Sequence, residues 1–220
     1  GELESFDRML KHPNGILLVT GPTGSGKSTT LYTALSELNT EDINIITVED
    51  PVEANLDGVN QVQVNAKADM TFASALRSIL RQDPDIIMLG EIRDVDTAQM
   101  AVRSSLTGHL LFSTIHTNTA WGAVARLSDM GVHPYLVANT LVMTVAQRLV
   151  RLLCSHCKRE VVATDEVRRL VSDAGAHFAA VGCERCFYTG YSGRRAVYEV
   201  IPMDDELSVA VRNGLSDVAP

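Results

Sequence analysis

The sequence lacks features that mark two large classes of protein. It has no run of about 18 residues free of polar side chains, so we expect no helix that crosses a bilayer. It has no excess of basic residues either, because 19 Lys and Arg stand against 27 Asp and Glu, giving a net charge of −8. Phosphate contacts dominate the affinity of nucleic-acid motors, and this charge balance therefore argues against that class.

Internal repeats and low-complexity segments are also absent, and cysteine is scarce, with four residues in 220. The hydrophobic share of 45% and the charged share of 21% are ordinary for a soluble globular protein. A chain of this length holds one full domain, or one domain and a small module. Because the first residue is Gly rather than Met, and residues 2–4 are already amphipathic, we expect an excised fragment of a longer protein.

The most informative feature that is present is a glycine-rich loop. It matches the phosphate-binding pattern G-x-x-x-x-G-K-[ST] and reads Gly21, Pro22, Thr23, Gly24, Ser25, Gly26, Lys27, Ser28 and Thr29. A short apolar, β-rich run precedes it and a helical pattern follows, which argues against a chance glycine-rich turn. Such a loop turns backbone N–H groups towards phosphate oxygens at a helix N-terminus. We expect Lys27 to reach the β- and γ-phosphates of a nucleotide and the Ser28 hydroxyl to bind Mg²⁺.

Strand and helix patterns alternate along most of the chain. Strands are predicted at 16–20, 43–48, 59–64, 85–90 and 109–115, and helices at 3–10, 29–38, 71–82, 95–106, 119–130 and 134–151. The segment at 59–64 alternates as an edge strand does, and Thr71 suits an N-cap. The alternation predicts an α/β fold, a mostly parallel sheet with helices on both faces.

A group of acidic residues follows the second predicted strand. Glu49, Asp50 and Glu53 stand at its carboxyl end, where parallel sheets place their ligand sites. Grouped carboxylates suit Mg²⁺, which prefers oxygen ligands. From these residues alone, a solvated acidic turn is an equal alternative.

A further carboxylate follows the strand predicted at 85–90. Gly90 stands where P-loop proteins usually have a metal-binding aspartate, and Glu91 comes one residue later. We therefore expect Glu91 to orient or deprotonate an attacking water. The alternative is an exposed residue at a strand end.

Two histidines bracket the strand predicted at 109–115. The odd spacing of His109 and His116 places them on opposite faces of a regular strand, so we expect them to do different work. One would sense the γ-phosphate and the other would face a neighbouring element. A lone histidine is more often structural than functional, but the polar run at 113–118 favours nucleotide sensing.

All four cysteines fall into two C-x₂-C pairs: Cys154 with Cys157, and Cys183 with Cys186. Four thiolates grouped in this way suit tetrahedral Zn²⁺ in a closed structural site, and a catalytic zinc is less expected. Disulfides are the alternative, disfavoured because a P-loop ATPase works in a reducing cytosol. His156, between the first two cysteines, is a weaker candidate ligand.

Together these motifs resemble one family closely, the ATPases that drive type II secretion and type IV pilus assembly. The resemblance rests on the segments 21–29, 46–53, 80–94, 107–120, 146–150 and 190–194, and runs from about Pro13 to Pro202. It implies a RecA-like P-loop ATPase core at 1–151, a zinc-binding tetracysteine module at 152–190, and a C-terminal strand and helix segment at 191–220.

The resemblance also implies roles for individual residues. Glu91 corresponds to the catalytic glutamate, Glu49 and Glu53 to the acidic box, and His109 and His116 to the histidine box, and Lys27 completes the expected catalytic set. The implied cofactors are ATP, Mg²⁺ and Zn²⁺, the zinc being bound by the four cysteines.

Partners and location follow from the same resemblance. It implies a homo-hexamer, cytoplasmic and peripheral at the inner face of the cytoplasmic membrane, acting on a membrane platform protein and not on nucleic acid. The tetracysteine module favours secretion or pilus assembly over pilus retraction. The family's N-terminal domains help to complete the nucleotide site and are absent from this sequence, so we expect nucleotide binding with slow hydrolysis.

Two other functions remain as alternatives. A nucleic-acid-translocating motor with a similar core is disfavoured by the net charge and the tetracysteine module, and a salt-dependent DNA-binding assay would distinguish it. A non-enzymatic nucleotide-gated scaffold is disfavoured by the presence of Lys27 and Glu91, and single-turnover hydrolysis would decide.

Overall fold

The chain forms two compact units in a computed structural model that describes residues 6, 8, 10–170 and 175–214. The sheet unit comprises the chain up to residue 148 and from residue 198 onwards, and the cysteine unit comprises residues 149–197. The predicted tetracysteine module at 152–190 lies within the cysteine unit, which extends beyond it at both ends. The helix predicted at 3–10 falls largely outside the described residues.

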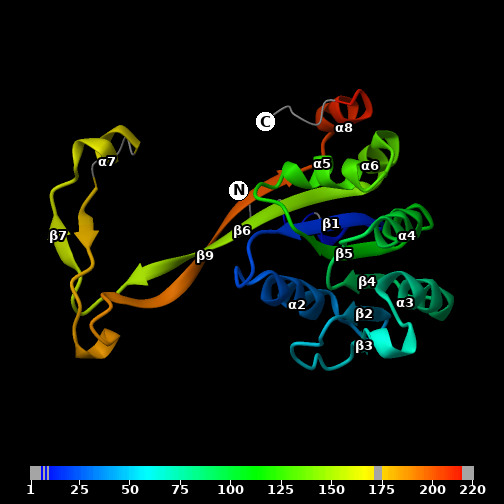
Figure 1. The fold of residues 1–220 in the computed structure, drawn as a ribbon, viewed down its shortest axis with the longest axis horizontal. Coiled ribbons are helices and arrows are strands. Elements are labelled where there is room, and N and C mark those ends of the chain that lie inside the picture. The colour runs from blue at the N-terminus through cyan, green and yellow to red at the C-terminus, as the bar shows by residue number, and fades with distance from the viewer. Residues whose placement is uncertain (1–5, 7, 9, 171–174, 215–220) are drawn as a thin grey trace. The chain divides into compact units, whose positions relative to one another are not determined.

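The sheet unit is built on strands in the order β3-β2-β4-β5-β1-β6-β9 (Figure 1). Their bounds are β1 (Gly15–Thr20), β2 (Ile45–Glu49), β3 (Asn60–Gln63), β4 (Ile86–Leu89), β5 (Leu110–Ile115), β6 (Leu141–Leu153) and β9 (Tyr191–Pro202). Every pair from β3 through β6 is parallel, and β3 is the edge strand that the sequence predicts. The carboxyl ends of β1, β2, β4 and β5 therefore share one edge of the sheet.

Helices cover both faces of this sheet (Figure 1). They are α2 (Lys27–Leu38), α3 (Phe72–Ile79), α4 (Val95–Leu106), α5 (Gly122–Asp129), α6 (Pro134–Thr140) and α8 (Asp205–Arg212), with short 3₁₀ turns at Ala66–Ala68 and Leu80–Gln82. Along β1, Leu17 and Val19 pack with α2, whereas Ile16 and Leu18 pack with the core formed by the other helices. Alternate side chains of one strand thus feed two cores, as expected for a sheet buried on both faces.

Helix α3 shows how local sequence sets a boundary. The Thr71 hydroxyl accepts a hydrogen bond from Ser74 N, and the Ser74 hydroxyl accepts one from Thr71 N, so two free N–H groups of the first turn are satisfied. Phe72, Leu76 and Ile79 then face the core. The predicted N-cap at Thr71 is confirmed.

The helix predicted at 134–151 is wrong beyond residue 140. Helix α6 begins at Pro134 and ends at Thr140, after which Leu141 adopts extended angles and β6 begins. Residues 141–147 are all buried, since β6 pairs with β1 inside the sheet. A strand buried on both faces shows no alternation of polar residues, so its periodicity resembles that of a buried helix. The β-branched Val142, Thr144 and Val145 are what favour the strand.

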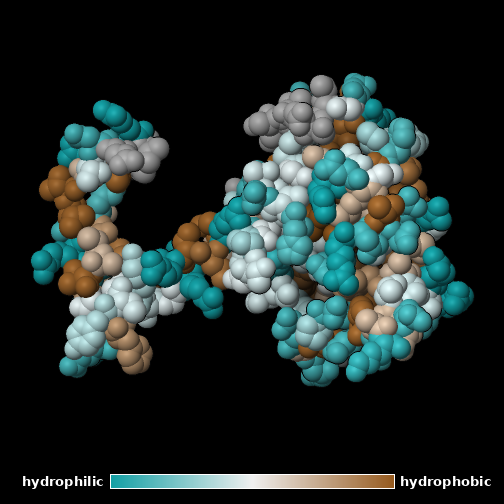
Figure 2. Space-filling view, in the orientation of Figure 1, coloured by the Kyte–Doolittle hydropathy of each residue, from teal (hydrophilic) through white to brown (hydrophobic). Residues whose placement is uncertain are grey.

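The cysteine unit is small and exposes several large apolar side chains. It contains β7 (Arg159–Val161) paired antiparallel with β8 (His177–Ala179), helix α7 (Asp165–Leu170) and a 3₁₀ turn at Glu184–Cys186. Val162 is 81% exposed and Phe187 is 88% exposed, and brown atoms mark this unit in Figure 2. So small a unit buries little apolar surface, and its stability must depend on cross-links between its segments, such as a bound metal or disulfides.

Across the described residues, no helix combines the length and the apolar character that crossing a membrane requires.

Candidate functional site

The glycine-rich loop joins β1 to α2 in a conformation that its glycines permit. Gly21, Gly24 and Gly26 have φ angles of 142°, 75° and 87°, which L side chains rarely adopt. A Cβ on Gly21 would lie 2.3 Å from the carbonyl oxygen of Gln147, so only glycine fits there. Helix α2 has no side-chain cap at its N-terminus, which leaves N–H groups of its first turn available to an anion.

A cavity of about 310 Å³ lies between this loop and the shared carboxyl edge of the sheet. Its walls include Lys27 and Ser28 from α2, Glu91 after β4 and His116 after β5. The end of β2 and the segment that follows it also contribute residues to these walls, namely Glu49, Asp50 and Glu53. The structure thus brings together most of the residues that the sequence analysis singled out from four separate segments.

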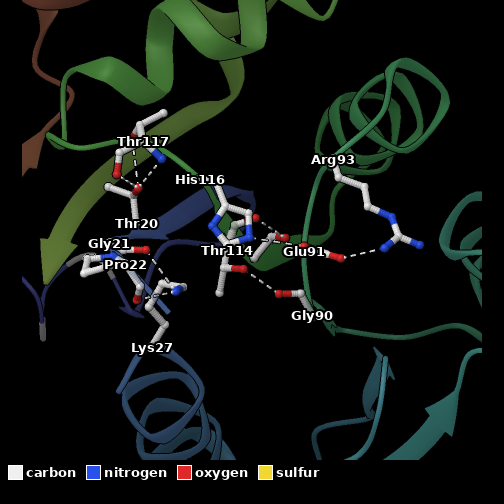
Figure 3. Close-up of polar contacts among 11 residues, drawn as sticks. Thr20, Gly21, Pro22, Lys27, Gly90, Glu91, Arg93, Thr114, His116 and Thr117 are labelled. Atoms are coloured by element: carbon white, nitrogen blue, oxygen red, sulfur yellow. Dashed lines mark hydrogen bonds and ion pairs between the residues drawn. The ribbon is translucent and has the colours of Figure 1, made fainter. Parts of the chain in front are cut away.

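Lys27 folds back onto the loop. Its Nζ donates hydrogen bonds to the carbonyl oxygens of Gly21 at 3.0 Å and Pro22 at 3.1 Å (Figure 3). Burial lowers the pKa of the Lys27 ammonium, and the nearby carboxylate of Glu91 opposes this effect. The cation of Lys27 therefore lies close to the carboxylate that is expected to act on water.

Glu91 is held at both its backbone and its side chain (Figure 3). Thr114 Oγ1 donates to Gly90 O at 2.6 Å, and Ile92 N donates to Thr114 O at 2.9 Å, so strand β5 fixes the peptides on either side of Glu91. The Glu91 carboxylate pairs through one oxygen with Arg93 Nη1 at 3.0 Å and through the other with His116 Nε2 at 3.4 Å. Its side chain is 25% exposed, so water can still reach it.

Thr20 ties the loop bearing His116 to the base of the glycine-rich loop. The Thr20 hydroxyl donates to Thr117 O at 2.7 Å and accepts from Thr117 N at 2.8 Å (Figure 3). Because Thr20 ends β1 and immediately precedes Gly21, the two loops share an anchor.

The carboxylates of the acidic segment differ in their surroundings. Glu49 is 3% exposed and accepts hydrogen bonds from Thr47 Oγ1 at 2.6 Å, from Gln61 Nε2 at 3.0 Å and from the Tyr32 hydroxyl. Burial and the hydrogen bond to Glu49 raise the pKa of Tyr32. The Tyr32 oxygen also accepts from Glu53 N at 3.2 Å. Glu49 therefore links β2, β3 and α2, while Glu53 is exposed beside the cavity.

His109 lies away from this cavity. It precedes β5 whereas His116 follows it, and the six residues of β5 separate the two by about 20 Å. His109 Nδ1 lies 2.9 Å from Ser104 O and 3.2 Å from Thr107 Oγ1. The two histidines do have different surroundings, and the catalytic role expected for His109 stays a prediction.

Some residues that shape the site were given no role of their own in the sequence analysis. Tyr32, Thr114 and Gln147 each hold a segment of the cavity wall through hydrogen bonds. The polar Gln147 within an apolar run could have indicated a buried hydrogen-bonding role. The helix predicted at 134–151 gave its side chain no such position.

The four cysteines of the cysteine unit form a second site. Their Sγ atoms all lie within 4.8 Å of one another, and Cys186 Sγ is 3.8 Å from Cys157 Sγ and from Cys183 Sγ. Four sulfurs bound tetrahedrally at about 2.3 Å from Zn²⁺ would be about 3.8 Å apart, whereas a disulfide needs about 2.05 Å. His156 contacts Arg185 and is outside the cluster. The donor set fits a structural Zn²⁺.

Backbone groups support the same interpretation. Burial disfavours the Cys186 thiolate, but the N–H groups of Cys183 and Gly190 and the neighbouring thiols outweigh burial and lower the pKa of Cys186 to about 6. At Cys157, by contrast, burial disfavours the thiolate and raises the pKa to about 11. Gly182 N donates to Cys157 Sγ at 3.3 Å. N–H groups directed at sulfur stabilise thiolates, which are the form that binds a metal.

The chain is similar to known proteins over almost its whole length. Residues 1–219 match the family model described as "Type II/IV secretion system protein". The chain is 52% identical over 220 residues to the type II secretion system ATPase E of Vibrio cholerae, covering 98% of the chain and 44% of that protein. It is 55% identical over 217 residues to the type II secretion system protein HxcR of Pseudomonas aeruginosa, covering 99% and 44%. The chain therefore spans less than half the length of these curated relatives.

A solved structure shares the fold. The pilus retraction motor PilT with bound ADP superposes with a TM-score of 0.71 at 30% identity, covering 94% of this chain and 53% of PilT.

Proposed function

Because the chain belongs to the type II/IV secretion system protein family, we propose that its sheet unit hydrolyses ATP to drive protein secretion or pilus assembly. The observation that carries the proposal is that Lys27, Glu91 and His116 border one cavity beside a phosphate-binding loop. The name of the Vibrio cholerae relative as an ATPase, and the ADP in the PilT structure, support the same nucleotide chemistry.

The residues have distinct tasks in this mechanism. The N–H groups of the glycine-rich loop and the Lys27 ammonium bind the phosphates and take up the charge that develops on them. Ser28 would hold Mg²⁺, and the carboxylates of Asp50 and Glu53, which line the same cavity, would help to bind it. The bound cation would supply positive charge against the phosphates of the nucleotide.

Glu91 acts on the attacking water. As the water oxygen bonds to the γ-phosphorus and the bond to the bridging oxygen of ADP breaks, Glu91 accepts the proton of the water and passes it to solvent. The ion pair of Glu91 with Arg93 and the contact of its other carboxylate oxygen with His116 Nε2 orient the carboxylate. We propose that His116, which borders the cavity and contacts Glu91, responds to the γ-phosphate.

The proposal extends to the assembly, the membrane partner and the zinc of the full-length protein. We propose that the full-length protein is a homo-hexamer at the cytoplasmic face of the inner membrane, where it acts on a membrane platform protein. The net charge of −8 supports a partner other than nucleic acid. The cysteine cluster supports one structural Zn²⁺ per chain, held by Cys154, Cys157, Cys183 and Cys186.

Substitution of the loop lysine tests the nucleotide site. Lys27→Ala removes the cation expected at the β- and γ-phosphates, so we expect the affinity for ATP with Mg²⁺ to fall at least about tenfold. Fluorescence titration of the purified chain measures this, and Lys67→Ala, at an exposed lysine of the 3₁₀ turn at Ala66–Ala68, is the matched control. Equal affinity of Lys27→Ala and the parent chain would refute the assignment of the loop.

A further inference from the structure

The strand that was predicted as a helix directs one buried side chain at the glycine-rich loop. Gln147 of β6 is 2% exposed. Its Nε2 donates to Ser25 O at 2.8 Å, and its Oε1 accepts from Thr30 Oγ1 at 2.8 Å. Ser25 belongs to the loop and Thr30 to the first turns of α2, so one amide group joins both parts of the phosphate-binding segment to the sheet.

The chemistry of the partners fixes the orientation of this amide. A backbone carbonyl only accepts hydrogen bonds, so the nitrogen of Gln147 must face Ser25. The oxygen of the amide then faces Thr30, whose hydroxyl can donate. Replacing this side chain by an apolar one would leave a buried carbonyl without its donor.

The hydrogen bond to Ser25 sets the direction of a second group. The Ser25 carbonyl and the Gly26 N–H belong to one peptide plane, and in a trans peptide they point in opposite directions. Holding the carbonyl against Gln147 therefore turns the Gly26 N–H away from β6. Gly24 and Lys27, which flank this peptide, line the cavity. Successive N–H groups in such a left-handed turn form an anion-binding concavity.

The backbone of Gln147 supports the start of the same loop. Its carbonyl oxygen occupies the space where a Cβ of Gly21 would be. Gln147 thus contacts the loop near its beginning, through a backbone oxygen, and near its end, through the side-chain amide.

We propose that Gln147 is a positioning residue for nucleotide binding, which orients the Ser25–Gly26 peptide so that the Gly26 N–H faces a phosphate oxygen. The inference rests on the proposed function and adds a residue from β6 to that site. Gln147 itself need not touch the nucleotide.

The test compares nucleotide affinity with fold stability in purified full chains. Gln147→Met keeps the length of the side chain and removes both hydrogen bonds. We expect the dissociation constant for fluorescent ADP with Mg²⁺ to rise about tenfold. Thr144→Val is the matched control, because this residue is also buried in β6 and its hydroxyl has no hydrogen-bond partner among the described residues. Its affinity should equal that of the parent.

A second variant keeps the test decisive should Gln147→Met not fold. Thr30→Val removes only the group that anchors the amide oxygen, and we expect a weakening of about threefold. A lower melting temperature of Gln147→Met with unchanged ADP affinity would indicate a merely structural role and overturn the inference, as would parent affinity in both variants. Failure of the parent chain to bind ADP would overturn the proposed function together with the inference, so the two failures are distinguishable.

Discussion

Glu91 depends on Thr114 for its place in the site. The Thr114 hydroxyl donates a hydrogen bond to Gly90 O, and the Thr114 carbonyl oxygen accepts one from Ile92 N. These bonds set the backbone from which the carboxylate reaches the cavity. A small displacement of a general base costs rate even where the base remains, because proton transfer needs hydrogen-bond distances.

Thr114→Val should therefore slow turnover more than it weakens binding. The substitution keeps the shape of a 6% exposed side chain and removes the donor to Gly90 O, at a cost to stability of about 1–2 kcal/mol. We expect kcat to fall about three- to tenfold, with ATP affinity within about twofold of the parent, and Thr114→Ser to restore turnover. Steady-state hydrolysis and thermal unfolding measure the two effects.

The control for this prediction is Thr140→Val in α6. Its hydroxyl donates to Leu136 O within the helix and is equally buried, away from the cavity. A similar loss of stability with unchanged turnover is expected. If both variants lowered kcat to the same extent, the positioning role of Thr114 would be wrong.

At the scale of single residues, the sequence predicts which residues border the cavity better than it predicts how the acidic residues after β2 differ from one another. Lys27, Ser28, Glu91 and His116 all border the cavity, because the motif and the shared carboxyl edge of a parallel sheet place them. The sequence could not separate Glu49 from its neighbours, since its burial depends on donors from β2, β3 and α2.

At the scale of elements, periodicity located the strands β1 to β5 but not the later ones, and it assigned β6 to a helix. The helix predicted at 95–106 is confirmed as α4, which buries Ala98, Ala101 and Val102 along one side. Strand β6 was missed because burial on both faces removes the alternation that identifies strands. In the cysteine unit, strands β7 and β8 are too short for their periodicity to predict them, whereas the spacing of the cysteines does predict a metal site.

The cysteine unit should depend on zinc for its order. We expect about one Zn²⁺ per chain, and removal by a chelator should speed hydrogen exchange in residues 152–190 while the sheet unit keeps its protection, since it has its own core. Elemental analysis and hydrogen exchange by mass spectrometry test this.

Two variants show which side chains bind the metal. Cys183→Ser should lose the zinc, whereas His156→Gln should keep it, because His156 lies outside the sulfur cluster. Metal-free, fully folded protein with four freely reactive thiols would contradict the zinc site.

At the scale of the whole molecule, charge is divided unevenly between the two units. Residues 149–197 carry eight Lys and Arg against five Asp and Glu, while the remainder carries 11 against 22. The sheet unit is therefore strongly acidic, although we propose that it binds a polyanionic nucleotide. Local groups, the Lys27 ammonium and the N–H groups of the loop, must therefore supply the attraction for the nucleotide.

Single-turnover hydrolysis by Glu91→Gln shows whether this cavity hydrolyses ATP with Glu91 as the base, as we propose. The assay holds the chain in excess over ATP, with Mg²⁺ present. The amide of the variant can still accept a hydrogen bond from water, but it is too weak a base to take the proton of the water. We predict ATP affinity within about threefold of the parent and a rate at least about 100-fold lower. Glu37→Gln, on the exposed side of α2, should match the parent. Hydrolysis by Glu91→Gln at the parent rate would show that Glu91 is not the base.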